Sequence, residues 1–188
     1  MNSDNTKIIL YDPLSSSSRR PPSRPSTEKK ANKRVVVATK KWNRLLNDDL
    51  LTHDAQWRII NLLHQQNADP VDAPMVQLYT QEINRKIYGY KTQDLEKHLF
   101  EENQFITFSN IIDLFIETEL QCFYCRNHVK VLYENVREPS QWSLERIDNE
   151  LGHNVGNVTI ACLSCNLKRR TMYHERYVFT KQLQITKI

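Results

Sequence analysis

The four cysteines of the chain form two pairs with the same internal spacing, Cys122/Cys125 and Cys162/Cys165. Two C-x-x-C pairs supply the four thiolates that a tetrahedral structural zinc site requires. Two disulfides, or a redox-active C-x-x-C, are the alternatives for the same residues. We expect structural Zn²⁺ and therefore an intracellular, reducing compartment, which the cytoplasm, the nucleus and a viral factory fit equally well.

A second group of chemically active residues lies between and just after the cysteine pairs. Most are carboxylate, amide or imidazole groups: Glu145, Arg146, Asp148, Asn149, His153, Asn157 and Asn166. Hard divalent ions take carboxylate and amide oxygens, and they stabilise the charge that builds on a phosphodiester attacked by water. Three basic residues follow at once, where they are expected to contact a phosphate backbone: Lys168, Arg169 and Arg170.

The elements that must position these groups are expected to change from helical to β near residue 120. Alternating apolar residues predict strands over 128–133, 141–147 and 157–161. A basic helix is expected over 166–173, and residues 174–183 either continue it or form a packing helix. One cysteine pair then forms a zinc knuckle before a strand, and the other lies where a strand passes into a helix. This arrangement predicts a treble clef whose metal replaces a core too small to form alone.

The motifs of this region resemble those of one nuclease superfamily. They are Cys122-x-x-Cys125, Trp142-Ser-Leu-Glu-Arg-Ile-Asp-Asn149, Gly152-His153, Asn157-Val158 and Cys162-x-x-Cys165-Asn166-x-Lys168. Over about residues 120–170 they are similar to the zinc-containing HNH (ββα-metal) endonucleases. They look most like a subgroup in phages and large DNA viruses that reads Asp/Glu-Arg-Ile-Asp-Asn where most members read Asp-His. The resemblance implies a metal-dependent endonuclease that hydrolyses DNA phosphodiester bonds.

The departure from Asp-His leaves the catalytic metal site open between two registers. In the superfamily the acidic residue that ends the first strand binds the metal, and the next residue is a histidine that acts as the base. Either Glu145-Arg146 or Asp148-Asn149 occupies that position here. We prefer Glu145, because it keeps the distance to the hairpin asparagine nearer to that of the superfamily. Asn166 is the expected second ligand of a Mg²⁺ or Mn²⁺ ion, with helix capping as its alternative.

Three further residues carry expected roles in the reaction. His153 is the only histidine inside the hairpin, and an imidazole suits proton abstraction near neutral pH, although it can instead pack or contact phosphate. Arg146 cannot act as a base, so it either clamps the scissile phosphate or pairs with Glu145. Asn157 is expected to orient the hairpin, with a purely structural turn as the alternative.

The first 119 residues contain no catalytic motif and are expected to be a tail and a scaffold. Residues 1–40 are rich in serine, proline and arginine, which predicts a disordered basic tail. Residues 41–119 show helical periodicity. The expected helices cover 41–66 with a break near 52–54, 75–88 ending at Gly89, a short helix from Thr92 to 99, and 105–120 capped by Ser109 or Asn110. The fold class is therefore α+β, with the zinc module over 120–188.

Charge distribution favours a polyanionic partner. Residues 1–41 carry a net +7, the middle of the chain −8 and residues 166–188 a net +5. Basic ends suit DNA, because Lys and Arg contacts to phosphate release counterions. No apolar run approaches the length of a membrane helix. Two rival functions stay open, namely a non-catalytic zinc module that binds nucleic acid, and a structural or virion-associated protein in which zinc only joins partners. A homodimer is compatible with either.

Overall fold

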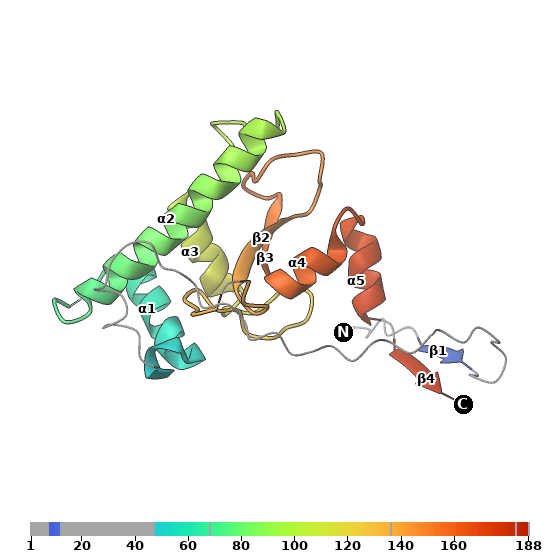
Figure 1. The fold of residues 1–188 in the computed structure, drawn as a ribbon, viewed down its shortest axis with the longest axis horizontal. Helices are drawn as coiled ribbons and strands as arrows, with labels where there is room; N and C mark the ends of the chain where they lie inside the picture. The colour runs from blue at the N-terminus through green and yellow to red at the C-terminus, as the bar shows by residue number, and fades with distance from the viewer. Residues whose placement is uncertain (1–7, 12–47, 68, 136, 183, 188) are drawn as a thin grey trace, which may run out of the picture.

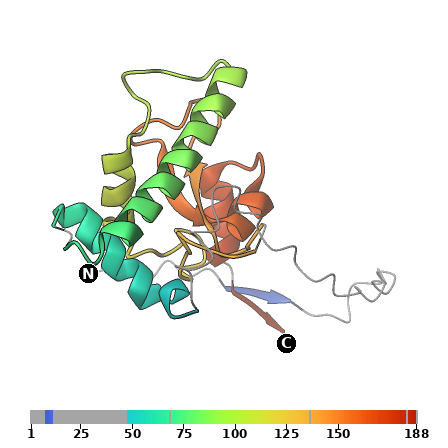
Figure 2. The ribbon, with the colours of Figure 1, turned by 60° about the vertical axis from the view of Figure 1, so that its left-hand side comes forward.

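The computed structural model describes residues 8–11, 48–67, 69–135, 137–182 and 184–187. Within them the chain is mixed α/β. Its elements in order are β1 (Ile8–Tyr11), the 3-10 helix η3 (Asp48–Leu51), α1 (His53–Gln65), α2 (Ala73–Glu96), α3 (Phe108–Glu117), β2 (Trp142–Arg146), β3 (Val158–Cys162), α4 (Leu163–Arg169), α5 (His174–Gln182) and β4 (Gln184–Lys187). Helices α1–α3 lie on one side of the β2–β3 hairpin and α4–α5 on the other (Figures 1 and 2). None of the described helices is both long and apolar enough to cross a membrane.

The expected disordered tail falls almost wholly outside the described residues. Its one described piece is β1, which pairs in parallel with β4 at the other end of the chain. The sequence predicts disorder for these four residues, whereas they form a strand. The short apolar run Ile8–Leu10 provides the β-branched and aliphatic residues that a strand favours.

Helix α2 is longer than the sequence predicts. It runs through Gly89, where a stop is expected, and the Thr92 hydroxyl donates to the Tyr88 carbonyl one turn earlier instead of capping a new helix. A glycine costs a helix only about 1 kcal/mol. Contacts of the second half of α2 offset that cost, because the Tyr90 hydroxyl accepts from the Leu144 amide at 2.9 Å and Asp94 is fully buried.

The caps of the other two scaffold helices are local. The break expected near residue 52 is confirmed, since the Thr52 side chain caps α1 by accepting from the Ala55 amide. The cap expected for α3 lies too late in the sequence. Thr107 is the cap, and Asn110 is its reciprocal partner in a capping box.

The two strands that carry the site are confirmed, and a third expected strand is absent. β2 and β3 pair antiparallel, from Trp142 opposite Cys162 to Arg146 opposite Val158. Within the described part of the chain, residues 128–133 form only isolated bridges. The reason is a side chain from α1: buried Gln56 accepts from the amides of Val131 and Leu132 at 2.8 and 3.0 Å. Its carboxamide satisfies the backbone groups that a neighbouring strand would have paired.

One hydrophobic core extends across the boundary expected near residue 120. It includes Ile60 of α1, Tyr79 of α2 and Phe115 of α3 together with Trp142 and Ile160 of the hairpin. The rings of Phe115 and Trp142 meet edge to face with centroids 5.0 Å apart. The scaffold helices and the cysteine-bearing hairpin are therefore packed as one unit.

Candidate metal centre and adjacent cationic cavity

The four cysteines converge at one place in the structure. Their sulfur atoms lie within 4.8 Å of one another, and Sγ of Cys125 is 3.9 Å from Sγ of Cys162. Tetrahedral zinc with Zn–S bonds of about 2.3 Å places its sulfurs about 3.8 Å apart. All four cysteines are free thiols, which differs from the alternative of two disulfides. The cluster can hold a metal ion such as zinc.

Two local backbone arrangements present the sulfurs to each other. At the first pair the Cys122 carbonyl accepts from the Arg126 amide at 2.9 Å, and Arg126 takes a left-handed φ of 59° that closes the turn. At the second pair, Cys162 caps α4, and its sulfur accepts from the Cys165 amide at 3.4 Å. Helix α4 therefore begins three residues before the expected start at Asn166. The hydrogen bond from Cys162 also lowers the pKa of the Cys122 thiol and raises that of the Cys162 thiol, so Cys122 is the one of these two sulfurs that ionises first.

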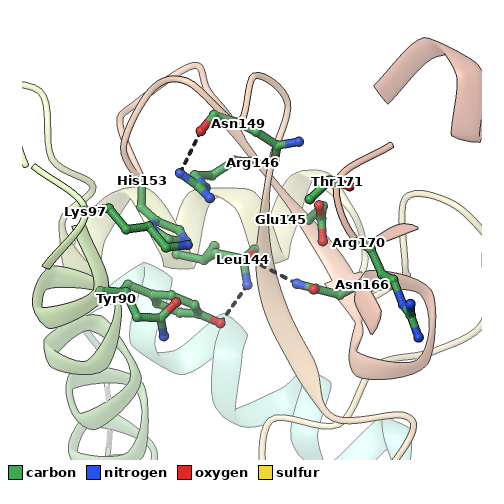
Figure 3. A pocket seen from close by; sticks show the side chains of 11 residues that line it. Tyr90, Lys97, Leu144, Glu145, Arg146, Asn149, His153, Asn166, Arg170 and Thr171 are labelled. Atoms are coloured by element: carbon green, nitrogen blue, oxygen red, sulfur yellow. Dashed lines mark hydrogen bonds between the residues drawn. The ribbon is translucent and has the colours of Figure 1, made fainter. Parts of the chain in front are cut away.

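A cavity of about 410 Å³ lies between the second half of α2, the strand β2 and helix α4 (Figure 3). It is lined by Tyr90, Gln93, Lys97, Leu144, Glu145, Arg146, Asn149, His153, Asn166, Arg170 and Thr171. Three of these side chains, Lys97, Arg146 and Arg170, are cationic at neutral pH, and Glu145 is a carboxylate. Because that carboxylate is itself paired with an arginine outside the cavity, the lining favours an anionic ligand such as phosphate.

His153 lines this cavity and is held by a carboxylate from the scaffold. Its Nδ1 lies 2.7 Å from Oδ1 of Asp94, and its backbone amide donates to Oδ2 of Asp94 at 2.6 Å. Within the described residues the second ring nitrogen, Nε2, has no hydrogen-bonding partner. Burial lowers the pKa of His153, while Asp94 opposes that shift. The ring is therefore neutral near pH 7 and able to accept a proton.

Glu145 also lines the cavity, but one of its oxygens is already occupied. Oε1 accepts a hydrogen bond from Nη1 of Arg169, and both side chains are buried. Oε2 is buried without any partner among the described residues. Burial raises the pKa of the Glu145 carboxyl, and the Arg169 hydrogen bond opposes the rise. Among the described residues of the lining, Oε2 is the carboxylate oxygen without a hydrogen-bonding partner.

The Arg169 side chain faces the interior, which corrects the prediction that it contacts phosphate. Besides Glu145, its guanidinium donates to the carbonyls of Arg146 and Ile147 at 2.6 and 2.9 Å. It therefore fastens α4 to the end of β2. Its neighbours Lys168 and Arg170 are exposed as expected, and Arg170 lines the cavity.

Asn166 reaches the same cavity from the first turn of α4. Its Nδ2 donates to the Leu144 carbonyl at 3.4 Å (Figure 3) and to Oγ of Ser143 at 3.2 Å. Both partners accept hydrogen bonds from it, so the carbonyl oxygen Oδ1 is the atom left without a described partner. Asn166 is not the cap of α4, because Cys162 holds that position.

The loop between β2 and β3 explains the remaining expected site residues. Asn157 is buried and donates to the carbonyls of Asp148 and Gly152 at 3.0 and 2.9 Å, while accepting from the Asp148 amide. It holds the loop closed and does not line the cavity, so the orienting interpretation fits it and direct catalysis does not. Arg146 lines the cavity and donates to the carbonyls of Asn149 and Leu151 instead of pairing with Glu145.

Asp148 is not brought to the cavity. It is exposed, and its carboxylate accepts from the Glu150 amide at 2.9 Å in a local turn. Of the two registers, only the one that uses Glu145 places a carboxylate beside Asn166 and His153 in the cavity lining. Asp148 as a metal ligand or catalytic residue is therefore not supported by the geometry.

Sequence analysis missed the contribution of α2 altogether. Helical periodicity assigns Asp94, Tyr90, Gln93 and Lys97 only to the scaffold, with Asp94 as an ordinary acidic residue near the start of a short helix. The missing information is tertiary, since Asp94 and His153 are 59 positions apart. The one local signal was Gly152, whose lack of a side chain lets the loop approach α2.

Gly152→Ala is expected to destabilise the fold by about 1–3 kcal/mol, the usual cost of overpacking. A Cβ at this position would lie 2.4 Å from the Leu99 carbonyl oxygen and 2.9 Å from Oδ2 of Asp94. Gly89→Ala is the matched control, because its Cβ would meet nothing within 4 Å in the middle of α2. Denaturant unfolding should show a gain in stability for the control. Equal stability of the two variants would contradict the close approach.

Comparison with protein-family models, with curated proteins and with solved structures finds no match for this chain.

Proposed function

We propose that the chain is a metal-dependent endonuclease that hydrolyses DNA phosphodiester bonds, built on a zinc-bound treble clef of HNH type. One observation carries the proposal. A neutral imidazole, His153, lines a cavity together with three cationic side chains, so a base and a phosphate site occupy the same space. The choice of DNA over RNA rests on the resemblance of the motifs between residues 120 and 170.

The chain's own residues supply a base and charge stabilisation. Nε2 of His153 accepts a proton from water as the water oxygen forms a bond to phosphorus. The bond from phosphorus to the leaving oxygen breaks, and the products are a phosphate monoester and an alcohol that takes its proton from solvent. Arg146, Arg170 and Lys97 are suited to binding the non-bridging phosphate oxygens, whose charge grows during the reaction.

The residues present fit a hard divalent cation in part. Oε2 of Glu145 is a buried carboxylate oxygen without a described partner, and Oδ1 of Asn166 is a second oxygen in the same lining. Carboxylate and amide oxygens are the ligands that Mg²⁺ and Mn²⁺ prefer. When bound, such an ion stabilises negative charge on the phosphate and on the leaving oxygen. Glu145 and Asn166 would hold it, and Asp148 would not.

A second candidate function is supported by the Glu145–Arg169 ion pair. The guanidinium of Arg169 already neutralises the carboxylate that a catalytic ion would use. A zinc module of this kind can bind nucleic acid through Lys168, Arg170 and the cavity cations without cutting it. Divalent-ion-dependent nicking separates the two functions, whereas salt-dependent DNA binding is expected from both.

The decisive experiment incubates the purified chain with supercoiled and branched DNA, with Mg²⁺ or Mn²⁺ and then with EDTA. Asn166→Ala and His153→Ala are each expected to lower the cleavage rate about 100-fold or more, as losses of a metal ligand and of a general base do. Asp148→Ala is the matched control in the same loop and should cleave like wild type. A wild-type chain that binds these DNAs but never nicks them would leave only the binding function. A dead Asp148→Ala would move the cation to the other register, in which Asn166 is still a ligand.

A further inference from the structure

We infer that Asp94 of α2 is a positioning residue that fixes the orientation and tautomer of His153, so that the scaffold helix is part of the site. The inference rests on the proposed function, in which His153 is the base. It assigns a role to a residue 28 positions before the first cysteine of the module. A chain restricted to residues 120–188 would lack this carboxylate.

The two carboxylate oxygens of Asp94 contact two different nitrogens of His153. Oδ1 of Asp94 lies 2.7 Å from Nδ1 of the His153 ring, and Oδ2 accepts from the backbone amide of the same residue at 2.6 Å. An ionised carboxylate only accepts hydrogen bonds. Nδ1 must therefore carry the proton, and Nε2 keeps the lone pair that a base needs. Asp94 is fully buried, so no water competes for these bonds.

A second contact from α2 prevents the ring from turning. The Tyr90 ring lies against the imidazole with centroids 4.5 Å apart. The Tyr90 hydroxyl is itself held, because it accepts from the Leu144 amide of β2 at 2.9 Å. Tyr90 and Asp94 are one helical turn apart and face the same side of α2. Helix α2 thus supports the ring from its edge and from its face.

Asp94 also stabilises the form of His153 that exists after proton transfer. Burial disfavours the imidazolium ion, and so do the positive charges of Arg146 and Lys97. The Asp94 charge and hydrogen bond oppose these effects. Removing the charge should therefore lower the pKa of His153. The base would remain deprotonated to lower pH, so the acidic limb of the pH–rate profile should move to lower pH.

Asp94→Asn is the test variant, because it keeps the shape and removes the charge. An asparagine whose Oδ1 accepts from the His153 amide turns its NH₂ group toward Nδ1. Nδ1 must then accept, and the proton moves to Nε2, where it blocks base function. We expect a fall in cleavage rate of about 100-fold or more near neutral pH, the order seen when a base is held in the wrong tautomer. The acidic limb should move to lower pH as well.

The matched control is Asp113→Asn on α3. Asp113 also faces a histidine, with Oδ1 3.7 Å from Nε2 of His64, but both side chains are exposed and neither lines the cavity. This variant should retain the wild-type rate and profile. A purely structural role for Asp94 predicts a different result, namely a smaller folded fraction with an unmoved acidic limb.

A spectroscopic measurement makes the inference independent of cleavage. Nitrogen NMR of histidine-labelled protein, with His153 assigned from the signal lost in His153→Gln, should show the proton on Nδ1 in wild type and on Nε2 in Asp94→Asn. An Nε2–H tautomer in wild type would overturn the inference even if the variant fails to fold. So would a folded variant with unchanged tautomer and unchanged acidic limb. If wild type shows the expected tautomer but cleaves no DNA, the endonuclease proposal fails while the positioning of His153 by Asp94 stands.

Discussion

Removing the metal from the cysteine cluster is expected to unfold the chain. Three of the four cysteines, Cys122, Cys162 and Cys165, belong to the hydrophobic core, and an ion would join the knuckle to both β3 and α4. Structural zinc contributes on the order of 10–16 kcal/mol to the folding of small zinc domains. The free energy of unfolding of a whole domain is only about 5–15 kcal/mol. Loss of the ion would therefore remove most or all of the stability of the fold.

The measurement combines metal analysis with unfolding. Purified protein should contain about one zinc per chain, and a strong chelator or Cys165→Ser should abolish the cooperative unfolding transition. Ser164→Ala, one residue earlier on α4, is the matched control and should keep both zinc and fold. A chain that is fully folded without metal would show that the four thiols need no ion.

Glu145→Ala is expected to lower the free energy of unfolding by about 3–5 kcal/mol, the cost of leaving a buried charge without its partner. From sequence alone this substitution should cost about 1 kcal/mol, because a hairpin-surface position is expected there. The structure changes that expectation, since Arg169 is buried and would lose the one carboxylate that pairs with it among the described residues. Activity and stability therefore do not separate at Glu145, and Asn166→Ala is the cleaner test of the catalytic ion.

The double substitution Glu145→Leu with Arg169→Met tests whether the stability is lost because Arg169 becomes an unpaired buried charge. Replacing a buried ion pair by apolar residues of similar size is often neutral, so much of the lost stability should return. Denaturant unfolding of the single and double variants gives the coupling between the two positions. Arg58→Ala, which removes an exposed guanidinium from its pair with Asp72, is the control and should change stability far less. A Glu145→Ala variant as stable as the control would argue against a buried ion pair.

The parts of the fold that sequence predicted well are those fixed by local spacing. The C-x-x-C pairs predicted the sulfur cluster, because each pair brings two ligands together within one turn. Alternation predicted β2 and β3 to within about a residue. The strand expected over 128–133 failed because its partner is the side chain of Gln56, some 75 positions away. No periodicity in either segment records such a contact.

The sequence predicted which residue types form the candidate site, but it did not predict the hydrogen bonds and ion pairs that connect them. Glu145, His153 and Asn166 do share one cavity lining. Composition could not distinguish Arg169 from its neighbours Lys168 and Arg170, although one side chain is buried and two are exposed. Asp94 escaped notice because an acidic residue on a helix is ordinarily solvated. Burial and long-range pairing decide these roles, and both depend on the tertiary structure.

Within five consecutive positions of helix α4, three side chains point to three different parts of the structure. Cys165 faces the sulfur cluster, Asn166 the cavity and Arg169 the end of β2. Each residue inserted into a helix rotates the later residues by about 100° around its axis. A single insertion between Cys165 and Arg169 would therefore redirect the guanidinium away from Glu145 while the thiolate stayed in place. During divergence this stretch should tolerate changes of residue type only at the exposed positions Leu167 and Lys168, and no change of length. The loop between β2 and β3 has more freedom to vary its exposed positions.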